Sequence, residues 1–151
     1  MRKQTKRKHY QLINPILHAI EGAAIVSGSK LDKLCMLELS SIESFRTGKA
    51  TLQDWQHIAS MMNIAEEMSR LGVGVEVIDC CERVQEHLEA AAKRFQTTGR
   101  MGLTGEGLQA VRDLYEYHHL QRKSVSLSEY ERHIQNTANR VRSKAPEVVE
   151  L

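Results

Sequence analysis

Residues with metal-binding chemistry stand together at positions 116 to 119, where Glu116 and His119 are three residues apart. Di-metal helical bundles use this Glu-x-x-His spacing twice, and the 151-residue chain holds no second copy. Neighbouring residues on a helix point about 100 degrees apart, so His118 and His119 do not easily share one ion. We therefore interpret His118 as part of a packed face and His119 as exposed. We expect neither a metal nor a cofactor.

Carboxylates are frequent in the central part of the chain, where a pair could serve acid and base catalysis. They are Glu66, Glu67, Glu82, Glu86 and Glu89. Helical spacing places the last three off the core face, so a solvated stripe is the simpler interpretation. Gly48-Lys49 is similar to part of a phosphate loop, but Glu43 stands where that motif needs its first glycine. The sequence therefore predicts no enzyme, and a metal-dependent enzyme stays an alternative on the count of 7 histidines alone.

The three cysteines, Cys35, Cys80 and Cys81, have neither zinc nor redox spacing. We expect reduced thiols, with Cys81 in the core and Cys80 partly exposed.

The most biased segment is the N-terminus, which carries five cations within seven residues. These cations are Arg2, Lys3, Lys6, Arg7 and Lys8, and Tyr10 follows them. The whole chain has a net charge of only +2, so the remainder is mildly acidic. Such an arm could neutralise phosphates while Tyr10 stacks on a base, or it could be a solvated terminus.

A second basic group lies near the other end of the chain. Its candidate nucleic-acid contacts are Arg122, Lys123, Arg140, Arg142 and Lys144. Two predicted helices joined by a three-residue turn resemble a helix-turn-helix here. However, Glu129 and Glu131 in the leading turn of the second helix would face phosphates, which favours an ordinary charged surface.

The composition of the chain and its helix-capping and helix-breaking residues predict the elements that must position these residues. The chain is 41% hydrophobic and 26% charged with 2 prolines, which is typical of a globular domain. We expect an all-α fold of about six helices, with an antiparallel pair (about 52–71 and 75–97) at its centre. The predicted units are a basic arm (1–13), a helical domain (14–145) and a tail (146–151). No apolar run reaches the roughly 20 residues of a membrane span, so we expect a cytoplasmic protein.

Caps and breaks define the predicted helices. Asn14-Pro15 begins the first, which ends before Ser27-Gly28-Ser29, and Gly48 closes the second. Three capping boxes are predicted, at Ser29/Asp32, Thr51/Asp54 and Ser126/Glu129. The most regular apolar seam has residues spaced alternately four and three positions apart, as in a coiled coil: Val77, Cys81, Val84, Leu88, Ala91 and Phe95. The glycines up to Gly107 predict a loop before the fifth helix. The segment 73–78 is rich in β-branched residues, so a short strand is an alternative prediction there.

The opening residues Arg2 to Tyr10, followed by Asn14-Pro15-Ile16-Leu17-His18-Ala19-Ile20, resemble the start of small uncharacterised proteins carried on prophages and plasmids. The resemblance covers about a sixth of the chain. It implies a class of short accessory proteins that bind nucleic acid or regulate a host protein, and it assigns no residue a role.

Two functions follow as hypotheses. The first is a non-enzymatic accessory protein that contacts nucleic acid through the arm and the basic end of the last helix. The alternative is a helical interaction module whose partner is another protein or a second copy of itself. For that alternative, Met61 and Met62 with Trp55 offer adaptable apolar surface, with Met62 packed and Met61 to its side.

Overall fold

A computed structural model describes residues 27–143 as one all-α domain of five packed helices, and it contains no strand in this range. The helices are α3 (Ser27–Arg46), α4 (Leu52–Arg70), α5 (Ile78–Thr98), α6 (Gly105–Lys123) and α7 (Leu127–Arg142), with a 3-10 turn, η1 (Val75–Val77), before α5. The all-α prediction is confirmed. The predicted helix at 15–26, the arm and the tail lie outside the described residues.

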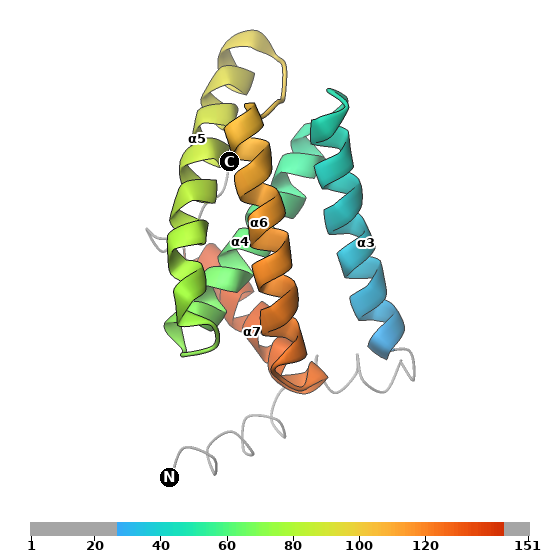
Figure 1. The fold of residues 1–151 in the computed structure, drawn as a ribbon, viewed down its shortest axis with the longest axis vertical. Helices are drawn as coiled ribbons and strands as arrows, with labels where there is room; N and C mark the ends of the chain where they lie inside the picture. Colours follow the sequence, from blue (N-terminus) through green and yellow to red (C-terminus); the bar gives the residue numbers. More distant parts are fainter. Residues whose placement is uncertain (1–26, 144–151) are drawn as a thin grey trace.

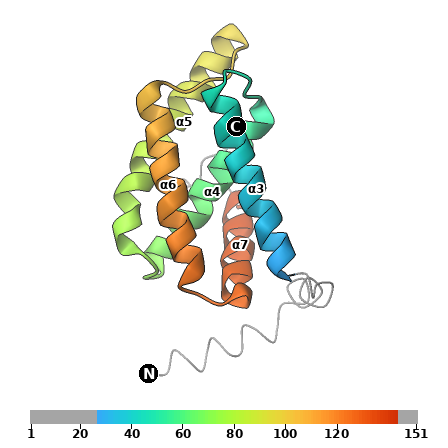
Figure 2. The same ribbon diagram turned by 45° about the vertical axis from the view of Figure 1, so that its right-hand side comes forward.

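Helix α4 is the element around which the others are arranged (Figures 1 and 2). It packs against α3, α5, α6 and α7, whereas α5 packs mainly against α4 and α6. The predicted antiparallel pair is α4 and α5, which run in opposite directions on either side of the turn at residues 71–77 (Figure 1). The segment 73–78, for which a short strand was an alternative prediction, forms part of that turn and η1.

Two of the three predicted capping boxes are confirmed. The Thr51 side chain accepts from the Asp54 amide while the Asp54 carboxylate accepts from the Thr51 amide, and Ser126 and Glu129 repeat this arrangement. These boxes satisfy amides that the first helical turn leaves without partners. The box at Ser29 is wrong, because Ser29 and the preceding two residues lie within α3. Three residues of types that often interrupt helices, Ser27, Gly28 and Ser29, therefore form part of this helix.

The seam of α5 forms the core as predicted, with Val84, Leu88 and Ala91 fully buried. Trp55 of α4 crosses to it, and its indole Nε1 donates to the Leu88 carbonyl oxygen at 2.9 Å. Both cysteines of α5 are buried, so the expectation that Cys80 is partly exposed is wrong. Burial raises the pKa of the Cys81 thiol to about 12, which leaves it protonated and unreactive.

Helix α6 begins earlier than predicted, at Gly105, because Thr104 caps it by accepting from the Gly107 amide at 3.0 Å. Gly107 is therefore a helical residue and not part of a loop. A Cβ at this position would lie 3.1 Å from the ring of His87 on α5. The glycine permits the close approach of α5 and α6, which outweighs its low helix propensity.

Candidate functional site

The basic residues predicted to bind nucleic acid are not brought together by the described part of the fold. Six of them, together with Tyr10, lie outside the described residues: Arg2, Lys3, Lys6, Arg7, Lys8 and Lys144. Arg140 forms an ion pair with Glu67 of α4, with 2.5 Å between Nη1 and Oε1. Lys123 and Arg142 are exposed, and Arg142 also donates to Asn139.

Arg122 is not a surface residue, which corrects the prediction that it contacts phosphate. It is buried, and its guanidinium forms an ion pair with Glu38 of α3, with 2.9 Å between Nη2 and Oε1. A second nitrogen, Nη1, donates to Glu38 Oε2 at 3.1 Å and lies 3.3 Å from the Tyr130 hydroxyl of α7. The two charges compensate each other inside the protein. No anion from solvent reaches this guanidinium.

The protonation of this pair follows from its surroundings. Burial raises the pKa of the Glu38 carboxyl above its ordinary value, and Arg122 offsets part of that rise. Burial would lower the pKa of Arg122, but the Glu38 carboxylate and the Tyr130 hydroxyl raise it above its ordinary value. Arg122 is therefore a permanent cation that requires an anion beside it.

A chain of hydrogen bonds continues from this ion pair into α6. Tyr130 lies 2.9 Å from Nε2 of His118, and His118 Nδ1 lies 2.7 Å from Oε1 of Gln121. Gln121 donates through Nε2 to three acceptors on the α4 side, namely Ala65 O, Ser69 Oγ and Val73 O. Because Oε1 of Gln121 only accepts, His118 Nδ1 carries the proton and Nε2 accepts from the Tyr130 hydroxyl.

The imidazole of His118 is therefore neutral, and its two nitrogens are both engaged. Burial, with Arg122 nearby, lowers its pKa to about 3. A neutral, fully buried imidazole with both nitrogens bonded neither titrates at neutral pH nor reaches a substrate. The hydrogen bonds and the ion pair connect α3, α4, α6 and α7. We define this buried network by Glu38, Arg122, Tyr130, His118 and Gln121, and its role is structural.

A second group has the residue types of a Ser-His-Asp triad, which the sequence analysis did not identify. Ser41 of α3 donates through its hydroxyl to Asp54 Oδ1 at 2.9 Å and lies 2.9 Å from His57 Nδ1. A triad needs the histidine between serine and aspartate, so that the ring takes the serine proton. Here the serine proton is already given to Asp54, so His57 must donate to the serine oxygen. The group joins α3 to α4 and does not activate a nucleophile.

Metal ligands are not assembled around residues 116 to 119. No group of three or more potential ligands occurs among residues 27–143. His118 is buried as predicted, but His119 is only half-exposed and stacks on Tyr115, with ring centroids 5.8 Å apart.

The apolar surface predicted on α4 is also absent, because Trp55, Met61 and Met62 are all buried in the core. The largest exposed apolar side chains lie elsewhere. Met36 on α3 is 68% exposed, and Leu37 and Leu39 flank it at 48% and 47%. A separate group comprises Leu71, Val75, Tyr117 and Leu120, around the ends of α4 and α6.

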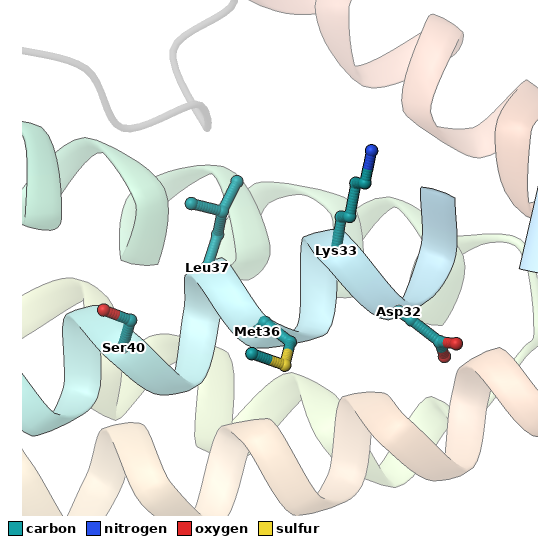
Figure 3. Close-up of a pocket in the computed structure, with 5 residues that line it drawn as sticks. All are labelled: Asp32, Lys33, Met36, Leu37 and Ser40. Atoms are coloured by element: carbon teal, nitrogen blue, oxygen red, sulfur yellow. The ribbon is translucent and has the colours of Figure 1, made fainter. Parts of the chain in front are cut away.

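The exposed apolar residues of α3 lie beside a hollow. Asp32, Lys33, Met36, Leu37 and Ser40 line it. Figure 3 shows Lys33 and Leu37 pointing to one side of the helix and Met36 to the other. We call Lys33, Met36, Leu37, Leu39, Ser40 and Glu43 the outer face of α3, and all six are exposed.

Comparison of the chain with protein-family models, curated proteins and solved structures gives no match. None of the helices between residues 27 and 143 combines the length and apolarity that crossing a bilayer requires. The residues themselves therefore carry the functional argument.

Proposed function

We propose that the protein is a non-enzymatic helical interaction module that binds another protein chain through the outer face of α3. The observation that carries this proposal is the exposure of Met36, Leu37 and Leu39 within four residues. Leu37 and Leu39 are two residues apart, so they lie on opposite flanks of the helix with Met36 between them. The three side chains therefore distribute apolar surface over the width of the face.

The inner face of the same helix supports the proposal. Leu31 and Leu34 pack on the second core cluster, and Ile42 and Phe45 belong to the main core. Apolar residues thus occur on all sides of α3 between residues 31 and 45. On a helix with one face against the core, apolar residues are expected mainly on that face, so the exposed Met36, Leu37 and Leu39 are additional to the core positions. A contiguous apolar patch on an otherwise polar surface marks an interaction site more often than a solvated one.

The test is a photo-reactive amino acid at Leu37, a large and exposed residue of the outer face, in cells that express the full chain. We expect a covalent adduct with a protein after illumination. The same amino acid at Glu86, which is exposed on α5, is the matched control. Adducts of equal yield at both positions, or none at Leu37, would contradict the proposal.

Nucleic-acid binding is a second candidate function, and the charge of the arm favours it. Five cations in residues 2–8 oppose a remainder that is mildly acidic. Exposed Lys123 and Arg142 could add phosphate contacts, whereas Arg122 could not. Deleting residues 1–9 should flatten the salt dependence of nucleic-acid affinity by several units of slope. Equal slopes for the intact and shortened chains would remove the role of the arm.

A further inference from the structure

Four exposed residues of α3 form a line along the middle of its outer face. Lys33, Met36, Ser40 and Glu43 follow one another by steps of three, four and three, which keeps their backbone positions along one side of the helix, although the side chains of Lys33 and Met36 extend in different directions from it (Figure 3). The line has a cation at one end, an anion at the other, and one large and one small residue between them. If a second, identical line lies antiparallel to the first, each cation faces an anion and each large residue faces a small one.

Resting on the proposed function, we propose that the partner of this face is a second copy of the chain, with the two α3 helices packed antiparallel about a two-fold axis. In such a contact residue i meets residue j and j meets i. Pairing Met36 with Ser40 of the second copy also places Lys33 beside Glu43 of that copy. Each of these contacts occurs twice.

The charges and sizes in this line suit that arrangement. Lys33 has no ion-pair partner among residues 27–143. Glu43 is held by Arg46, whose Nε donates to its carboxylate at 3.0 Å, and a carboxylate retains lone pairs for a further cation. The small Ser40 leaves room for Met36, whose flexible thioether adapts to an irregular surface. Leu37 and Leu39 would lose water contact at the two edges.

Sedimentation equilibrium of the full chain over a wide range of concentration tests the proposal. We expect a mass approaching twice 17.2 kDa, and a dissociation constant weakened by about a hundredfold in Met36→Glu, because the variant sets two carboxylates in the contact. Leu120→Glu, also at a highly exposed position, is the matched control and should leave the mass unchanged. A monomer at every concentration, or a dimer that only Leu120→Glu dissociates, overturns the proposal.

Charge reversal tests the antiparallel pairing itself. Lys33→Glu places two glutamates together at each end of the contact, and Glu43→Lys places two lysines together, so each variant should weaken dimerisation about tenfold. The double variant Lys33→Glu/Glu43→Lys restores opposite charges and should regain most of the affinity. Lys49→Glu, at an exposed lysine outside the face, is the control. The pairing is overturned if the single variants dimerise as tightly as the original chain, or if the double variant dimerises more weakly than both single variants.

The photo-reactive residue at Leu37 separates this proposal from the function on which it rests. An adduct of two copies of the chain supports both. An adduct with a different protein from a chain that sediments as a monomer supports the interaction module and overturns self-association. The absence of any adduct at Leu37 contradicts the interaction module.

Discussion

Each face of α3 carries a residue whose polarity is unusual for its burial, and the two faces treat that residue differently. On the inner face, Glu38 is 1% exposed although it carries a charge, while two residues earlier Met36 is 68% exposed although it is apolar. Burying a charge is unfavourable unless a partner compensates it, and Arg122 supplies that partner from α6. Exposing a methionine is unfavourable to a smaller degree, and no side chain among residues 27–143 buries it. Within this range, the charge on the inner face has a partner and the apolar side chain on the outer face does not.

The largest expected effect comes from breaking the ion pair on the inner face. Arg122→Ala leaves Glu38 as a buried charge without a cation, so we expect the free energy of unfolding in urea to fall by about 3 to 5 kcal/mol. Replacing both residues by apolar ones, as Glu38→Leu/Arg122→Met, should be clearly less destabilising than Arg122→Ala. If the free energy of unfolding is lower for the double variant than for Arg122→Ala, the ion pair itself contributes net stability.

The next effect is a pH dependence caused by His118. Its pKa is about 3 in the folded protein and 6.5 in the reference state, so the unfolded chain binds a proton between these values and the native protein does not. Stability is therefore lost as the pH falls through 6.5, by about 1.4 kcal/mol per pH unit. Urea unfolding from pH 6.5 to 4.5 should show this slope, and His118→Gln should remove that part of it. His133, whose pKa burial also lowers, contributes the same sign in both proteins.

A smaller effect is expected at Tyr130, whose hydroxyl connects Arg122 to His118. Tyr130→Phe keeps the ring in the core but leaves a buried imidazole nitrogen without its donor. We expect a loss of about 1 to 3 kcal/mol in the free energy of unfolding. Tyr117→Phe on α6, where the ring is 41% exposed, is the control and should change little. Equal losses would show that the network does not depend on the hydroxyl.

The smallest effect on stability is expected on the outer face. Met36→Ser removes an exposed apolar side chain and should change the free energy of unfolding by less than about 0.5 kcal/mol under conditions where the chain is monomeric. Thermal and urea unfolding at low protein concentration measure this. A loss above about 2 kcal/mol would mean that Met36 is packed within its own chain, and the contrast between the two faces would fail.

Local signals in the sequence predict the helices well. The boxes at Thr51 and Ser126 and the seam through Val84 and Leu88 depend on residues within a few positions of each other, and the structure confirms them. The helical Ser27-Gly28-Ser29 shows the opposite case. Turn propensity there is a weak preference that the rest of the helix overrides.

Long-range pairings are what the sequence could not supply. Arg122 was expected on the surface because arginine is seldom buried, yet its partner Glu38 lies 84 positions away. One signal was available: Leu114, His118 and Gln121 share a face of α6, so polar residues occupied core positions. The same limit explains Met61, which helical periodicity placed at the side of α4. Neighbours on all sides of this central helix bury it.

Trp55 gives the molecule an optical reporter of its own. It is the chain's 1 tryptophan, it is 1% exposed, and its indole N–H is bonded to the backbone of α5. Its emission should therefore be blue-shifted in the native state and move to longer wavelength when α4 and α5 separate. Because the ring lies inside the core and not on the outer face of α3, two chains coming together should leave its spectrum unchanged. Tryptophan fluorescence therefore reports unfolding without a contribution from association, and the mass from sedimentation reports association.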